Sequence, residues 1–264
     1  MRPLNYIMHI PKTAGMSLQG LVRRRHKTDG SLELVYSKEH LEKGFTDHPK
    51  LETVMGHFRF GFNHNSDRKP RYFVFLRDPV NQVISHYYYS LEKPEKFEDL
   101  PENISSVVEF ARSAYGYNLQ TRFISGIDQI KDHEDEAVAR AKWNLSHHFE
   151  MVGLTEKFDQ SLLLMGQHLN WQILFYARHN EGRHRKQNPP VSAEEIGALK
   201  EILWPDLQVY DWGRKIFERQ YQAVPASNIR LQGFRIGNRL FQFLNPTYTR
   251  LKEMLGKAGD PHEK

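Results

Sequence analysis

Residues 6–17 constrain the fold of this 264-residue chain more than any other stretch. The apolar run from Tyr6 to Ile10 predicts a buried strand, and a loop that carries one lysine, Lys12, follows it. A helical pattern then begins near Ser17 and runs through Leu18, Leu21 and Val22. Such a strand-to-helix turn directs backbone N–H groups and the positive end of the helix dipole at one point, where Lys12 adds a full charge. We therefore predict a site for a phosphate or a sulfate ester.

The glycine spacing of this loop narrows the kind of anion site. The phosphate loop of nucleotide hydrolases needs two glycines before its lysine, and the dinucleotide fingerprint needs three glycines. Here only Gly15 stands in the loop, so neither pattern fits. An ordinary strand-to-helix turn with an exposed lysine remains the alternative.

A second motif combines a strand with a strongly signalled helix start. Five consecutive apolar or aromatic residues, 72–76, predict a central strand that is buried on both faces. Asp78 and Pro79 then predict an N-cap followed by proline in the first turn of a helix. Arg77 therefore stands where the strand ends.

The two motifs are expected to meet, because ligands of open parallel sheets bind beyond the carboxyl ends of the strands. Lys12 and Arg77 would reach one pocket from neighbouring strands, and Ser85, two turns into the following helix, would point at the same anion. A metal-dependent phosphotransferase is expected to place an acidic residue at such a strand end to hold magnesium. This chain places an arginine there.

Together, the motifs resemble those of sulfotransferases that use 3′-phosphoadenosine 5′-phosphosulfate (PAPS), in particular the carbohydrate type related to heparan sulfate 2-O-sulfotransferases. The resemblance implies a P-loop-like three-layer α/β fold, PAPS as donor, 3′-phosphoadenosine 5′-phosphate (PAP) as product, and no metal. In that family the first loop holds the 5′-phosphosulfate, a role that falls here to Lys12, Thr13, Ala14, Gly15, Met16 and Ser17. The arginine and serine of the second motif hold the 3′-phosphate, which gives Arg77 and Ser85.

The resemblance also supplies a candidate catalytic base. The stretch 54–60 resembles the family's short strand that ends in Gly-His, and its histidine is His57 here. A neutral imidazole can take the proton of an acceptor hydroxyl as the sulfur–oxygen bond forms. Some relatives carry a second histidine two positions earlier, where this chain has Met55. A histidine that merely caps the strand end by hydrogen bonding is the structural alternative. Lys12 would stabilise charge on the sulfuryl group and on the leaving phosphate.

Acceptor-binding residues are indicated more weakly, since the resemblance is sharp over residues 6–90 and fades after about residue 180. Asn118 and Arg122 lie four apart, so on a helix they share one face, and the corresponding segment of relatives borders the acceptor pocket. Arg59 is a further candidate. An ordinary surface salt bridge is an equal alternative for Arg122. Glu156, at the start of the helix expected next in the chain, is either a partner for that helix's N-terminal dipole or an orienting group for a base.

The rest of the chain alternates strands and helices, as a parallel sheet with crossover helices requires. We expect further strands at 33–37, 53–56 and 151–154, helices at 134–148 and 159–169, and capping boxes at Ser106 with Glu109 and at Ser192 with Glu195. Loop 178–192 is either a lid over the cofactor or solvated. The basic, aromatic tail 226–264 would pack across the domain, self-associate or touch a membrane. We predict one domain, 1–264, with a cofactor core of about 1–170 and a helical part of about 192–264.

The composition of the chain excludes several kinds of site and several classes of protein. The chain has no cysteine, so thiolate catalysis, disulfides and thiolate-bound metals are ruled out. No apolar run is long enough to span a membrane, and the first strand begins almost at Met1. We therefore expect a cytoplasmic protein and, because eukaryotic members of the family have a membrane anchor, a bacterial one. The formal charge of +5 suits an anionic cofactor, and no nucleic-acid recognition motif is present.

The predicted function is transfer of a sulfuryl group from PAPS to a hydroxyl of an acceptor, a carbohydrate on the resemblance alone. A nucleotide or sugar kinase is one alternative, which a requirement for magnesium and ATP would favour. A non-catalytic nucleotide-binding module is another. The sequence leaves the oligomeric state open.

Overall fold

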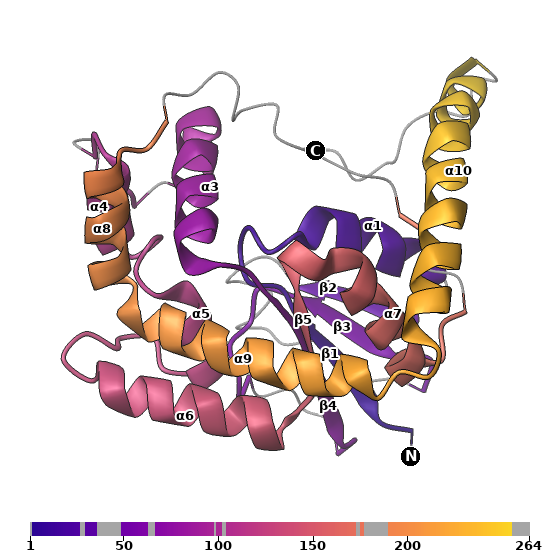
Figure 1. Ribbon diagram of the computed structural model, residues 1–264, viewed down its shortest axis with the longest axis horizontal. Helices are drawn as coiled ribbons and strands as arrows, with labels where there is room; N and C mark the ends of the chain where they lie inside the picture. Colours follow the sequence, from indigo (N-terminus) through magenta and orange to yellow (C-terminus); the bar gives the residue numbers. More distant parts are fainter. Residues whose placement is uncertain are drawn as a thin grey trace.

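The computed structural model describes residues 2–26, 30–35, 49–62, 67–97, 99–101, 104–172, 175–176 and 190–254, the last ten of them as backbone only. Within these residues, five parallel strands form one sheet (Figure 1). In sheet order they are β2 (Leu32–Val35), β3 (Thr53–Gly56), β1 (Leu4–Met8), β4 (Pro70–Leu76) and β5 (Phe149–Leu154). Because the strands are parallel, their carboxyl ends meet at one edge of the sheet.

The two middle strands have the continuous apolar sequences of strands covered on both faces. Tyr6 and Ile7 of β1 and Phe73 and Val74 of β4 are completely buried. Strand β1 ends two residues before the predicted Ile10, because the chain turns there: the backbone N–H of Thr13 donates to the Ile10 carbonyl (3.3 Å).

Helices complete the chain, with two short 3₁₀ helices at Pro94–Lys96 and Thr155–Lys157. The helices are α1 (Gly15–Arg25), α3 (Pro79–Glu92), α4 (Val107–Arg112), α5 (Leu119–Ser125), α6 (Glu134–His147), α7 (Phe158–Leu169), α8 (Ala193–Ile202), α9 (Trp204–Gln222) and α10 (Ser227–Met254). They cover both faces of the sheet. Gly213 of α9 packs against Leu76, whereas Phe158 at the start of α7 packs on Phe75 (ring centroids 5.6 Å apart), and neighbouring strand residues point to opposite faces. The predicted three-layer α/β fold is confirmed.

Helix starts follow the local sequence signals. The side chain of Asp78 accepts a hydrogen bond from the backbone N–H of Asn81 (2.8 Å), and Pro79 is the first residue of α3. Both predicted capping boxes are present, at the starts of α4 and α8. Helix α1 begins at Gly15, two residues before the predicted start, since Ala14 takes the N-cap position.

Two hydrophobic clusters hold the molecule together. The larger lies around the sheet, and a smaller one joins α3, α4 and α8, the group of helices at the left of Figure 1. Phe97, Phe110 and Leu199 are buried in the smaller cluster, and His86 of α3 packs between the two phenylalanines (centroids 5.3 and 5.4 Å away). None of the helices described here is long and apolar enough to cross a membrane.

Candidate functional site

The loop between β1 and α1 has the shape of an anion cradle. Lys12 and Ala14 both adopt left-handed backbone conformations (φ 66° and 64°), which wind the loop tightly before α1. No side chain caps the N-terminus of α1, and its first turn contains no acidic residue. The N–H groups of a first helical turn have no acceptor within the helix, and the helix dipole is positive there. The backbone from Ala14 to Ser17 is therefore suited to bind an anion.

Thr13 makes its contacts within the loop itself. Its hydroxyl donates to the Ile10 carbonyl (2.8 Å), its backbone N–H points to the same oxygen, and its side chain is buried. Thr13 thus fixes the turn that positions the following N–H groups. A direct contact of Thr13 with the cofactor stays a prediction.

Lys12 presents an ammonium group that is easily neutralised. Its Nζ lies 4.1 Å from the centre of the Tyr89 ring, on α3. Burial, together with the charge of Arg77, lowers the pKa of Lys12 to about 8, and Glu92 opposes that shift. An incoming phosphate or sulfate would restore the charge, because a nearby anion favours the protonated amine.

Arg77 joins the ends of β1 and β4, as the sequence predicts for neighbouring strands. Its Nη1 donates to the carbonyl oxygen of Lys12 (2.9 Å). Gln120 of α5 holds the backbone of Arg77 through both its N–H (3.1 Å) and its carbonyl (2.7 Å). Gln82 of α3 donates to the Pro11 carbonyl (2.9 Å) and ties that helix to the same loop. The two glutamines were not anticipated from the sequence. Their partners are backbone groups, and no sequence motif marks such contacts.

Ser85 lies on α3 with its side chain half-buried, further along the helix that begins beside Arg77. Its predicted partnership with Arg77 at a 3′-phosphate stays a prediction. His86, the next residue, faces the smaller cluster, where burial lowers its pKa to about 3.

His57 is held in the tautomer that a general base needs. Its Nδ1 lies 2.7 Å from the carbonyl oxygen of His9. A carbonyl only accepts, so Nδ1 carries the proton and Nε2 keeps its lone pair. Burial lowers the pKa of His57, against the hydrogen bond to His9, and the ring is therefore neutral at pH 7.

His9 is a neighbour of the candidate base that sequence reasoning missed. Its ring stacks on His57 (centroids 4.5 Å apart, planes inclined by 26°). Burial, His57 and Lys12 together hold the pKa of His9 well below its usual value. A side-chain carbon at Gly15 would lie 1.5 Å from Nε2 of His9, so only glycine leaves room for the ring beside α1. The sequence did offer one indication that His9 lies near His57, because each of the two histidines directly follows a strand of the sheet.

The glycine before His57 also has a steric reason. A side-chain carbon at Gly56 would lie 1.7 Å from the carbonyl oxygen of Val35. The backbone N–H of His57 donates to that same oxygen (2.8 Å). The Gly-His pair thus lets β2 approach β3 closely enough to fix the backbone of the candidate base.

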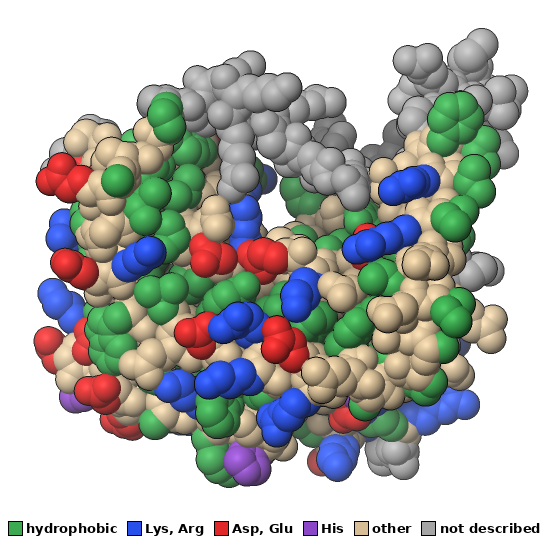
Figure 2. Space-filling view, in the orientation of Figure 1, with side chains coloured by type: hydrophobic (Ala, Val, Ile, Leu, Met, Phe, Trp, Pro, Cys, Tyr) green, Lys and Arg blue, Asp and Glu red, His purple; other side chains and the backbone are tan. Residues whose placement is uncertain are grey.

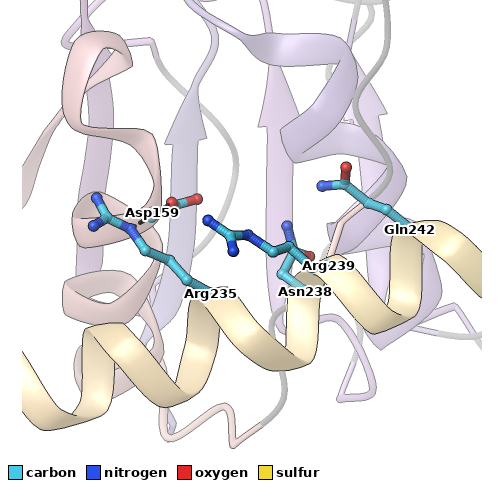
Figure 3. Close-up of a pocket in the computed structure, with 5 residues that line it drawn as sticks. All are labelled: Asp159, Arg235, Asn238, Arg239 and Gln242. Atoms are coloured by element: carbon cyan, nitrogen blue, oxygen red, sulfur yellow. Dashed lines mark hydrogen bonds and ion pairs between the residues drawn. The ribbon is translucent and has the colours of Figure 1, made fainter.

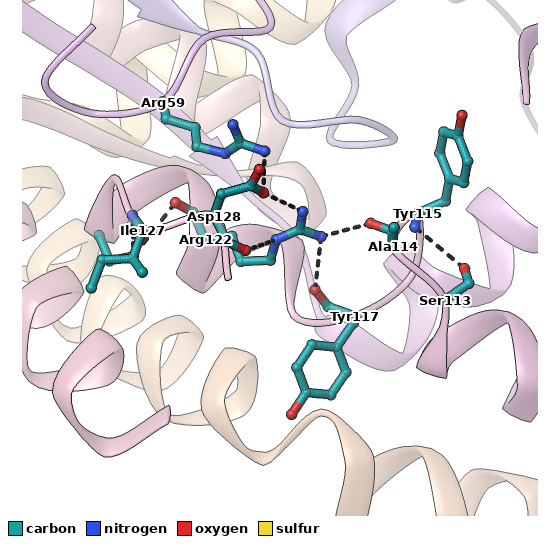
Figure 4. A network of polar contacts seen from close by, with 9 residues as sticks. Arg59, Ser113, Ala114, Tyr115, Tyr117, Arg122, Ile127 and Asp128 are labelled. Carbon is teal, nitrogen blue, oxygen red and sulfur yellow. Dashed lines mark hydrogen bonds and ion pairs between the residues drawn. The ribbon is translucent and has the colours of Figure 1, made fainter. Parts of the chain in front are cut away.

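Arg59 and Arg122 share one carboxylate in the network of Figure 4. Asp128 Oδ1 lies 2.5 Å from Nη2 of each arginine. Arg122 also donates to the carbonyls of Asp128 (2.8 Å) and Ala114 (2.6 Å), and it is almost fully buried. Arg122 therefore ties its own helix to two loops. Its role in acceptor binding stays a prediction without support from this geometry. The side chain of Arg59 is partly exposed, which leaves it more accessible to an acceptor.

Asn118 is likewise turned inward. It is completely buried, donates to the Ile202 carbonyl (3.0 Å), and accepts from the backbone N–H of Asp206 (3.2 Å). Asp206, in turn, accepts from the backbone N–H groups of Gln120 (3.2 Å) and Thr121 (2.7 Å). These contacts cap α5 from α9, and an acceptor contact by Asn118 stays a prediction.

Glu156 serves the start of α3. One carboxylate oxygen accepts from the backbone N–H of Asp78 (2.8 Å), and the other accepts from the hydroxyl of Tyr210 (3.2 Å). The contact is thus made at the start of α3 and not at the start of the helix that follows Glu156, and both predicted roles stay predictions.

Two further expectations concern metals and the loop 178–192. Among the residues described, no group of three metal-ligating side chains comes together, and the absence of a metal requirement stays a prediction. Residues 178–189 of the predicted lid lie outside the described residues.

A pocket of about 440 Å³ lies between α7 and α10 (Figure 3). Its lining is polar and includes Asp159, Arg235 and Arg239. Residues of the anion-binding loop do not line it. Polar lining alone does not identify a ligand, and the candidate site remains at the ends of β1, β3 and β4.

Comparison with known proteins points to sulfotransferases. The chain is 24% identical over 140 residues to human uronyl 2-sulfotransferase and to the mouse uronyl 2-sulfotransferase, and the match covers 47% of this chain and 34% of each relative. It therefore spans about a third of the length of the curated relatives it matches. This similarity confirms the resemblance that the two motifs indicate.

Among solved structures, mouse sulfotransferase SULT7A1 complexed with PAP aligns over 88% of this chain and 89% of that chain, with 13% identity and a TM-score of 0.39. No family model matches the chain.

Proposed function

We propose that this protein transfers a sulfuryl group from PAPS to a hydroxyl of a carbohydrate acceptor. The observation that carries the proposal is the orientation of His57, whose Nδ1–H is committed to the His9 carbonyl while Nε2 keeps a lone pair. This candidate base stands at the same sheet edge as the loop that carries Lys12, because β1 and β3 are parallel neighbours. A base for a hydroxyl beside a cradle for a phosphosulfate is what sulfuryl transfer requires.

Each candidate residue has its own role in the proposed reaction. Lys12 and the backbone N–H groups from Ala14 to Ser17 would hold the 5′-phosphosulfate, and Arg77 with Ser85 would hold the 3′-phosphate. The acceptor oxygen attacks sulfur, its proton passes to Nε2 of His57, and the bond from sulfur to the phosphate oxygen breaks. PAP then leaves with the electron pair of that bond. Donors fixed in advance on the leaving phosphate would stabilise the charge that develops there.

The carbohydrate nature of the acceptor rests on the relatives, two uronyl 2-sulfotransferases. The cytoplasmic location and bacterial origin indicated by the sequence stay predictions. No observation favours a kinase, because the residue at the end of β4 is Arg77 and not a magnesium-binding carboxylate.

The test is incubation of the purified chain with radiolabelled PAPS and a panel of saccharides, with parallel arms for ATP plus magnesium. We expect labelled saccharide from PAPS, and we expect His57→Ala to lower the rate by about 10²–10⁴-fold with PAP affinity unchanged. His147→Ala is the matched control, since that histidine is exposed on α6.

Three outcomes would contradict the proposal. Transfer from ATP alone would indicate a kinase, and PAP binding without turnover on any acceptor would indicate a binding module. Loss of PAP affinity in parallel with rate in His57→Ala would make His57 a structural residue.

A further inference from the structure

Helix α10 carries a stripe of exposed apolar side chains along its outer side, which we call the outer stripe. Its members are Ile229 (74% exposed), Ile236 (62%), Leu240 (58%), Phe243 (78%) and Leu244 (61%). Their spacing of seven, four, three and one residues places them on one helix face. They make up five of the nine large hydrophobic side chains exposed in the described part of the chain. Contiguous exposure of this kind marks an interaction surface rather than ordinary surface composition.

The opposite face of α10 already anchors the helix to the protein. Leu231 and Phe234 are buried there, and Phe234 lies 5.9 Å from Phe175 between ring centroids. Asn238 accepts from the backbone N–H of Tyr176 (2.8 Å). The outer stripe is therefore a second apolar face, which the described residues leave exposed at the edge of the molecule (Figures 1 and 2).

Arginines flank the outer stripe on both sides. With 100° per residue, Arg230 stands on one flank and Arg235 and Arg239 stand on the other. Arg235 forms an ion pair with Asp159 (3.2 Å), whereas Arg239 has no ion pair among the described residues (Figure 3). The sequence of α10 contains no acidic residue before Glu253. The surface around the stripe is thus cationic.

We propose that the outer stripe docks this protein onto an anionic lipid surface. An apolar helix face bordered by arginines matches the boundary between lipid headgroups and acyl chains, where apolar side chains insert and guanidinium groups bind phosphates. The positive charge around the outer stripe favours an anionic lipid surface over a second copy of this chain. A second copy of α10 would bring arginines against arginines, and like charges across an interface disfavour the pairing.

The test is cosedimentation of the full chain with phosphatidylcholine vesicles that contain or lack phosphatidylglycerol, at low and high salt. We expect binding to the anionic vesicles that falls with salt. The double variant I236E/L240E should lower partitioning at least about tenfold, because it places two carboxylates in the stripe. The variant R230Q/R239Q should lower partitioning by about fivefold for each arginine. Leu91→Glu is the matched control, since Leu91 is 56% exposed on α3, outside the stripe.

Circular dichroism of each variant checks that the helices are intact. Failure of the wild type to sediment with anionic vesicles would overturn the proposal. Equal binding to neutral vesicles would overturn the part of it that rests on charge. A wild-type dimer in sedimentation velocity that I236E/L240E separates, without vesicle binding, would assign the stripe to a second copy instead.

Discussion

Binding of PAP should weaken as the pH rises above neutrality, because Lys12 has a pKa of about 8. The protonated form carries the charge that binds the anion, so raising the pH removes affinity. With a pKa of about 8 the protonated fraction falls about tenfold between pH 7 and pH 9. A hydrogen bond to a charged group contributes about 1.5–3 kcal/mol. Complete loss of the Lys12 charge can therefore weaken PAP binding by at most roughly 10- to 150-fold. We therefore expect the Kd of PAP to rise about five- to tenfold over this range.

Calorimetric titration of PAP into wild type and two variants measures the effect. Lys12→Arg keeps its charge, so its affinity should be flat from pH 7 to pH 9. Lys12→Met should be equally flat, and at pH 7 it should bind PAP more weakly than wild type by that maximum of roughly 10- to 150-fold, a gap that narrows towards pH 9. The histidines at the site do not confound the slope, since the pKa values of His9 and His57 both lie below the ordinary value.

Lys96→Met is the matched control, because Lys96 also contacts Tyr89, through a hydrogen bond to its hydroxyl (3.0 Å). It should keep the fall of affinity with pH, displaced to slightly higher pH, because Lys96 is the weaker of the two positive charges that lower the pKa of Lys12. The reasoning would be refuted by a slope in Lys12→Met equal to that of the wild type, since some other group would then titrate.

Two further predictions concern the cofactor's other end and the scaffold. Arg77→Ala should weaken PAP at least about tenfold more than adenosine 5′-phosphate, and Ser85→Ala should shift the same ratio of Kd values by less, because a neutral hydroxyl contributes about 0.5–1.5 kcal/mol. An unchanged ratio in Arg77→Ala would remove the 3′-phosphate from this arginine. Asp206→Ala should lower the free energy of unfolding in urea by about 2–4 kcal/mol, because it leaves two buried N–H groups of α5 without an acceptor. Asp211→Ala, an exposed control on α9, should stay within about 0.5 kcal/mol of wild type, and equal losses in both variants would contradict the capping role.

Local patterns predicted most of the elements that build the site. Apolar runs located the strands to within two residues, and Asp78 with Pro79 fixed the start of α3, because these signals depend only on neighbours in the chain. The meeting of Lys12 and Arg77 followed from parallel strand topology. Helix α1 begins earlier than predicted, because Ala14 takes the N-cap position in a left-handed conformation. An alanine in the sequence does not indicate that conformation.

Contacts between distant segments account for what the sequence left out. His9 stacks on His57, although the two histidines follow different strands and lie 48 positions apart in the chain. The residues next to either histidine do not indicate this contact. Arg122 satisfies carbonyls of two loops, which helical spacing alone cannot reveal. The exposed face of α10 became visible only when its opposite face was seen to be packed.

The hydrogen bond from Arg77 to the Lys12 carbonyl links the two ends of the proposed cofactor site through a single side chain. In the proposed site this guanidinium would contact both the backbone of the Lys12 loop and the 3′-phosphate, so a change at either contact would affect the other. The two ends should therefore be energetically coupled, so that the effects of changing Lys12 and Arg77 do not add. A donor that lacks the group bound by Arg77 would also meet a less firmly held loop around its sulfuryl group. Discrimination between nucleotides would then appear in the rate of transfer as well as in affinity.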